Sequence, residues 1–110
     1  MRAQQQQQAA SYRLPPPGSC DDAVMRRALA HGDDQYAGGQ YAIALGYYQD
    51  AEKACPGRPQ PELSLARVYE AMGNRAEARR HYQRALDAAP AGTSVADQAR
   101  RGVNRLNSGL

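Results

Sequence analysis

Apolar residues recur along most of the chain at the three- and four-residue spacing of an amphipathic helix. The clearest stripes are Leu65, Val68, Tyr69 and Met72; Ala78, Tyr82, Ala85 and Ala89; and Val95, Ala99, Val103 and Leu106. Breakers rich in Gly and Pro separate the stripes, and no segment shows the strict alternation of a half-buried strand. The pattern predicts an all-α chain of five helices, at about 20–37, 40–55, 61–72, 75–89 and 94–107.

Short polar side chains stand where three of these helices begin. Ser19 precedes Asp22, and Ser94 precedes Asp97, at the spacing of a capping box. Asn74 precedes a helix that carries Glu77 three residues later, so it is expected to cap the fourth helix. Because the loops are short, neighbouring helices should run antiparallel, as a series of αα-hairpins.

The first 18 residues differ from the rest of the chain. They hold five consecutive Gln, at 4–8, and three consecutive Pro, at 15–17, with Leu14 as their one large aliphatic residue. Such a segment buries too little apolar surface to offset the entropy of ordering it. We expect a disordered lead over 1–18, with its prolines acting as a stiff spacer rather than as a ligand for a proline-recognition domain, and a folded domain over 19–108.

The sequence repeats itself at an offset of 34 residues. The matched pairs are Gly39 with Gly73, Ala44 with Ala78, Tyr48 with Tyr82, Gln49 with Gln83, Ala51 with Ala85, Ala54 with Ala88 and Pro56 with Pro90. Ala favours helices and lets their axes approach closely, and the matched Tyr residues are expected to fill the space between hairpins. The chain therefore contains two copies of one helical hairpin.

A helix–turn–helix unit with this period resembles the tetratricopeptide repeat. The second unit, about 59–92, carries the pattern through Leu65, Ala66, Tyr69, Gly73, Ala78, Tyr82 and Pro90; the first, about 25–58, does so through Tyr41, Ala44, Tyr48, Ala51 and Pro56. Ala28 and Glu62 replace the family's Trp. The resemblance implies an αα-hairpin superhelix of two repeats closed by a capping helix at about 94–107. Since about three units are usually needed, further contacts from the start of the first helix or from another chain are expected.

The two cysteines fall at the same end of the first hairpin. Cys20 opens its first helix and Cys55 closes its second, so a disulfide is sterically feasible in an antiparallel pair. Such a bridge needs an oxidising compartment and favours a periplasmic or cell-envelope protein whose targeting segment lies upstream; two free thiols in a cytoplasmic protein are the alternative.

The sequence offers no motif for catalysis, for a metal or for a cofactor. His31 and His81 lie 50 residues apart and do not combine with the two Cys into zinc-ligand spacing. We interpret His31 as a packed or hydrogen-bonded imidazole that faces the first helix pair, and we place His81 on the outer face of the fourth helix. The sequence contains no run of about 18 apolar residues, so membrane insertion is not expected. A non-catalytic protein with no metal and no cofactor is expected.

Thirteen of the 14 basic residues are Arg, and the net charge is +3. Arg residues concentrate on the last two helices, where Glu77, Asp87 and Asp97 interleave with them. A solvated, salt-bridged face is therefore favoured over nucleic-acid binding. Arg105 is assigned to the solvent-exposed outer side of the capping helix.

The resemblance also implies a concave groove that binds a peptide or a partner helix. By helical phase its lining would be Arg26, Leu29, Asp33, Tyr36, Leu63, Arg67, Glu70, Asp97 and Arg101. Arg67 and Arg101 could hold an acidic group. The leading interpretation is a protein-interaction module, an adaptor or assembly factor of a bacterial envelope or secretion system; a homo-oligomerisation domain is the alternative.

Overall fold

The computed structural model describes residues 20–108, and this part of the chain contains five helices and no strand. The helices are α2 (Asp22–Ala37), α3 (Tyr41–Ala54), α4 (Pro59–Ala71), α5 (Arg75–Ala88) and α6 (Ser94–Ser108). The prediction of an all-α fold of five helices is confirmed. The predicted disordered lead at 1–18 lies outside the described residues.

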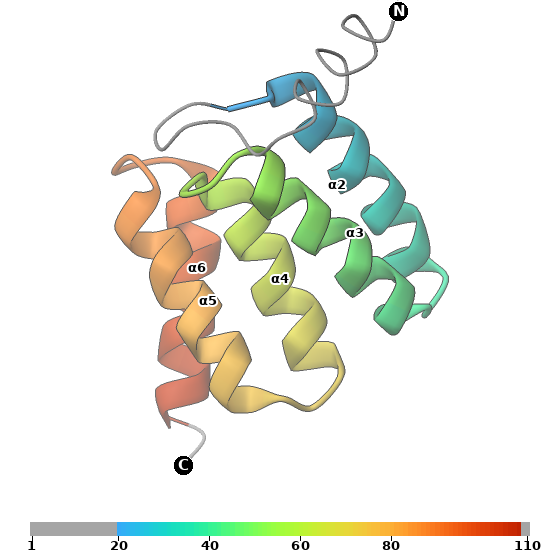
Figure 1. Ribbon diagram of the computed structural model, residues 1–110. Coiled ribbons are helices and arrows are strands. Elements are labelled where there is room, and N and C mark those ends of the chain that lie inside the picture. The colour runs from blue at the N-terminus through green and yellow to red at the C-terminus, as the bar shows by residue number, and fades with distance from the viewer. Residues whose placement is uncertain (1–19, 109–110) are drawn as a thin grey trace, which may run out of the picture.

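The helices pack as two antiparallel hairpins followed by a single helix (Figure 1). α2 pairs with α3, α4 pairs with α5, and α6 packs on α5, while α3 joins the two hairpins by packing on α4. The chain advances from α2, blue in Figure 1, across the stack to α6, red. α4 contacts both α2 and α6, so these three helices form one layer, and α3 and α5 form the other.

The residue that caps the helix agrees with the prediction at α5 and differs from it at α6. The Asn74 side chain accepts a hydrogen bond from the backbone N–H three residues later, at 3.3 Å, as predicted. At α6 the cap is Thr93, whose hydroxyl accepts at 3.3 Å, so the prediction of Ser94 is wrong by one residue. Asp21 caps α2, with an N–H to carboxylate distance of 3.2 Å; the predicted cap, Ser19, lies outside the described residues.

α4 begins at Pro59, two residues before the predicted start. Proline is favourable in the first turn of a helix, because its fixed φ suits the helix and its missing N–H would have no helical acceptor there. Both Pro59 and Pro61 therefore belong to α4, and both are buried.

A glycine forms the turn inside each hairpin. Gly39 and Gly73 have φ of 76° and 83°, a left-handed conformation that side chains with a Cβ rarely adopt. In both turns the amide after the glycine donates to a carbonyl five residues earlier, at 2.8 and 2.9 Å. The 34-residue sequence repeat is thus also a repeat of backbone hydrogen bonds.

Two matched tyrosines fill the space between neighbouring units, as predicted. Tyr48 lies in a buried cluster with Leu65 of α4, and Tyr82 lies in a buried cluster with Leu106 of α6. The alanines that let the helices approach are fully buried: Ala44, Ala51, Ala66, Ala78 and Ala85. In the core, Ala therefore occupies the close contacts between helices, and Tyr fills the wider spaces between units.

A disulfide joins Cys20 and Cys55, as the hairpin geometry predicts. It ties the start of α2 to the end of α3, where the Asp21 amide also donates to the Ala54 carbonyl at 2.9 Å. Cys55 is fully buried against Met25 in the core of the first hairpin. Among the described residues, no helix combines the length and the apolar character needed to cross a bilayer.

Candidate functional site

The nine residues predicted to line a groove lie on the layer formed by α2, α4 and α6. α2 carries Arg26, Leu29, Asp33 and Tyr36; α4 carries Leu63, Arg67 and Glu70; α6 carries Asp97 and Arg101. The structure brings Leu63, Arg67 and Arg101 together around one hollow of about 170 Å³, whose other lining residues are Tyr82, Gln98 and Arg105. The hollow thus combines a buried leucine with three guanidinium groups.

Arg67 links this hollow to the first hairpin. Its guanidinium carbon lies 5.3 Å from the centre of the Tyr36 ring, within the range of a cation–π interaction. Asp33, one turn earlier on α2, accepts a hydrogen bond from the Tyr48 hydroxyl at 2.6 Å. Burial, and then the Asp33 carboxylate, raise the pKa of Tyr48, so this hydroxyl remains a donor. Asp33 therefore stabilises the hairpin as well as bordering the predicted groove.

Glu70 is occupied by contacts within the chain. Its two carboxylate oxygens accept hydrogen bonds from Arg105, at 2.7 and 2.8 Å, and one of them also accepts from the Tyr82 hydroxyl at 2.7 Å. The bonds from Arg105 hold the pKa of Glu70 below its usual value. The assignment of Arg105 to the outer side of α6 was therefore wrong, because the side chain reaches across to α4.

The remaining predicted groove residues lie apart from the hollow. Arg26 forms an ion pair with Asp22 on the surface of α2. Asp97 lies 3.5 Å from Arg100 on α6. Leu29 is half-buried and packs against the core of the first hairpin and its junction with α4. None of these three residues lines the hollow between α4 and α6.

A second cluster, which the sequence did not predict, joins three helices. His81 of α5 and Glu62 of α4 are buried, and the His81 Nδ1 lies 2.6 Å from a Glu62 oxygen. Glu52 of α3 completes the cluster. Its hydrogen bond to Glu62 raises the pKa of Glu52 to about 7. Burial works against ionisation of Glu62, but hydrogen bonds from His81 and Glu52 lower its pKa overall.

Both histidines differ from their predicted environments. The placement of His81 on the outer face of α5 was wrong, since the residue is only 6% exposed. His31 was expected to face the first helix pair as a packed or hydrogen-bonded imidazole. It is exposed, and its ring stacks on Tyr47 with the ring centres 5.3 Å apart.

Comparison with known proteins agrees with this helical repeat. The family model of the tetratricopeptide repeat matches residues 63–91, which cover most of α4 and all of α5. Residues 63–91 form a tetratricopeptide repeat, and the stack of five helices is consistent with a tetratricopeptide-like fold. No curated protein matches the chain at a significant level.

The tetratricopeptide pattern identifies the signal that could have revealed the buried cluster. Glu62 occupies the position of the family's Trp, a large side chain that packs against the neighbouring helix. A carboxylate at such a position needs a partner, because burying an unpaired charge is costly. His81 supplies that partner from the second helix of the same repeat. Sequence spacing does not show this pairing, since the two residues are 19 positions apart.

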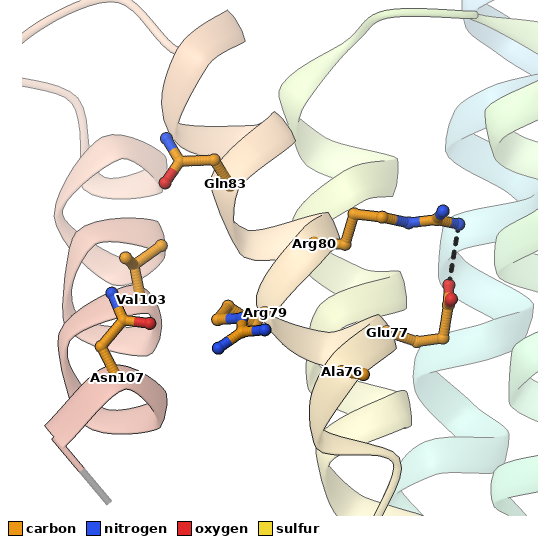
Figure 2. A pocket seen from close by; sticks show the side chains of 7 residues that line it. All are labelled: Ala76, Glu77, Arg79, Arg80, Gln83, Val103 and Asn107. Atoms are coloured by element: carbon orange, nitrogen blue, oxygen red, sulfur yellow. Dashed lines mark hydrogen bonds and ion pairs between the residues drawn. The ribbon is translucent and has the colours of Figure 1, made fainter. Parts of the chain in front are cut away.

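The basic residues of α5 and α6 are partly neutralised by acidic residues. A hollow of about 480 Å³ between α5 and α6 is lined by Ala76, Glu77, Arg79, Arg80, Gln83, Val103 and Asn107. Figure 2 shows Arg79 pointing toward α6, while Arg80 turns to the other side and pairs with Glu77 at 3.0 Å. With the pair between Arg100 and Asp97, this agrees with the interleaved charges seen in the sequence.

Proposed function

We propose that the chain is a non-catalytic protein-interaction module that binds a peptide or partner helix along α2, α4 and α6, and that an acidic group of the partner enters the hollow between α4 and α6. The observation that carries this proposal is the pair Arg67 and Arg101 beside Leu63. Within residues 20–108, neither Arg lies within ion-pair distance of a carboxylate.

The chemistry of the hollow supports an acidic group with an apolar neighbour. A guanidinium presents paired N–H donors that match both oxygens of a carboxylate. Glu70, three residues after Arg67 on α4, already accepts bonds from Arg105 and Tyr82. Its charge is therefore satisfied, and Arg67 and Arg101 remain as donors for a partner. Tyr36 extends the surface toward α2 through its contact with Arg67.

A role as an adaptor or assembly factor in a bacterial envelope or secretion system is the finer part of the proposal. Its support is the disulfide between Cys20 and Cys55, since such bridges persist in oxidising compartments such as the periplasm. Tetratricopeptide repeats act through protein partners, and the hollow beside Leu63, Arg67 and Arg101 supports this class of function.

Selection from a phage-displayed library of random linear peptides tests the groove. Peptides with Asp, Glu or a free carboxyl terminus should be enriched on the immobilised chain. In fluorescence anisotropy they should bind the Arg67→Ala/Arg101→Ala variant at least about tenfold more weakly, because charge-assisted hydrogen bonds are lost. The matched control, Arg79→Ala/Arg80→Ala, removes the same charge from the other face and should retain binding. Equal loss in both variants, or none in the first, would refute the groove assignment.

Self-association is a second candidate, and one observation favours it. Ile43 on α3 is 51% exposed and borders a shallow hollow with Gly46 and Tyr47. A second copy would cover this apolar side chain, which lies in the first turn of α3, next to the turn that joins α2 and α3. Sedimentation velocity over a wide concentration range tests this candidate: dimers that Ile43→Glu abolishes would support it, and a monomer at every concentration would contradict it.

A further inference from the structure

Three ionisable side chains from three helices meet at the junction of the two hairpins. Glu52 comes from α3, Glu62 from α4 and His81 from α5, and one ligand atom of each lies within 4.8 Å of the other two. Glu62 and His81 are only 5% and 6% exposed, and Glu52 is half-buried. Glu62 and His81 are the buried ionisable side chains outside the tyrosines within 20–108, and the side chains packed around them in the core are mostly apolar.

The imidazole of His81 is held in a fixed orientation. The Tyr69 ring stacks on it, with the ring centres 5.4 Å apart and the planes 15° from parallel. Nδ1 points toward Glu62, while Nε2 lies 3.7 Å from an oxygen of Glu77. Glu77 is in turn held by Arg80 at 3.0 Å. Metal-binding histidines commonly have such a carboxylate beside the nitrogen that does not bind the ion, because it fixes the ring and its tautomer.

We propose that Glu52, Glu62 and the Nδ1 of His81 form a binding site for a divalent transition-metal ion of the zinc class. One nitrogen and two carboxylate oxygens are ligands that Zn²⁺ accepts in four-coordinate sites, with water as the fourth ligand. The half-exposed Glu52 leaves a path from solvent to the site. This site lies at the junction of the hairpins and is independent of the proposed peptide groove.

The donor set distinguishes between classes of ion. Ca²⁺ takes six to eight oxygen ligands and Mg²⁺ takes octahedral oxygen ligands, so a cluster with one imidazole and two carboxylates suits neither. Soft ions such as Cu(I) prefer thiolates, and both cysteines are joined in the disulfide. Zn²⁺ and its tetrahedral substitute Co²⁺ fit the donors best.

Binding requires a small rearrangement of the side chains. The Nδ1 of His81 and the Glu62 oxygen are 2.6 Å apart, as in a hydrogen bond. Two ligands of a tetrahedral zinc ion lie about 3.3 Å apart, given metal–ligand distances of roughly 2.0–2.2 Å. The two atoms must therefore move about 0.7 Å further apart. The protons that now join the three groups leave to solvent as the ion takes their place.

Thermal unfolding of the untagged, disulfide-intact full chain, stripped of metal with a chelator, tests the site. An ion that binds the folded state alone raises the unfolding midpoint, by about 10 °C or more when zinc chloride is present at 100 times its dissociation constant. Cobalt chloride is the second probe, because a tetrahedral Co²⁺ site absorbs visible light. One equivalent of either ion should saturate the wild-type chain.

Matched variants separate a metal site from a hydrogen-bonded network. Glu52→Gln keeps a donor for Glu62, so the metal-free fold should persist, but it replaces a carboxylate ligand with an amide. Glu52→Gln should bind zinc at least about tenfold more weakly than the wild type, and its unfolding midpoint should therefore rise less at the same zinc concentration. His31→Gln removes the other, exposed histidine and should bind as the wild type does. The proposal fails if neither ion moves the wild-type midpoint, or if Glu52→Gln responds as strongly as the wild type.

Discussion

Replacing Gly102 of α6 with Ala tests how closely the last helix packs on the second repeat. A Cβ at this position would lie 2.5 Å from Cδ1 of Tyr82 and 2.6 Å from two further ring atoms. Carbon atoms in contact are normally about 3.5–4.0 Å apart, so the ring or the helix must move. Tyr82 is 3% exposed, and its hydroxyl is bonded to Glu70, so the ring has little freedom to turn away.

Two opposing effects set the magnitude for Gly102→Ala. Ala is about 1 kcal/mol more favourable than Gly inside a helix. Overpacking a well-filled site costs about 1–3 kcal/mol. The net change in the free energy of unfolding should therefore lie between about zero and a loss of 2 kcal/mol. Gly46 of α3 is the matched control: it is exposed, a Cβ there meets no atom within 4 Å, and Gly46→Ala should gain about 1 kcal/mol.

Urea unfolding followed by circular dichroism, without reductant, measures both variants under one condition. We expect Gly102→Ala to be about 1–3 kcal/mol less stable than Gly46→Ala, which for a domain of this size separates their thermal midpoints by about 5–20 °C. If Gly102→Ala gains as much stability as Gly46→Ala, the close contact between α6 and Tyr82 does not exist in solution, and the reasoning is refuted.

Two further predictions concern the disulfide and the Glu70 ion pair. Reduction of the Cys20–Cys55 bridge, which closes a span of 35 residues, should lower the free energy of unfolding by about 4 kcal/mol; denaturant curves with and without reductant measure this, and coincident curves would contradict it. Because the fold lowers the pKa of Glu70, its stabilising effect is present above the ordinary carboxylate pKa of 4.5 and disappears as the pH falls through the lowered value. In urea unfolding curves between about pH 6 and pH 3, the free energy of unfolding of the wild type should therefore fall by about 1 kcal/mol more than that of Glu70→Gln. The difference is modest because Arg105 is more than half exposed. Equal losses in the two proteins would argue against the ion pair.

The sequence by itself determined the helices, their pairing and the repeat. Helical spacing of apolar residues is a local signal, and the glycines at the two turns have a local cause, since a left-handed φ is required there. The offset of 34 residues then assigned Tyr48 and Tyr82 to equivalent places between units. The sequence did not identify every capping residue correctly: Thr93, and not Ser94, caps α6. Neighbouring polar residues can each serve as the cap, and the sequence pattern does not distinguish between them.

Only the tertiary structure decided which charged side chains meet. Arg105 reaches Glu70 across 35 positions, and His81 reaches Glu62 across 19, so neither pairing leaves a periodic pattern in the sequence. Long polar side chains can turn toward solvent or toward a neighbouring helix from the same backbone position. Which of these they do depends on the partners that the packing brings within hydrogen-bond distance. The hollow with Arg67 and Arg101 and the cluster of Glu52, Glu62 and His81 are therefore properties of the assembled stack of helices.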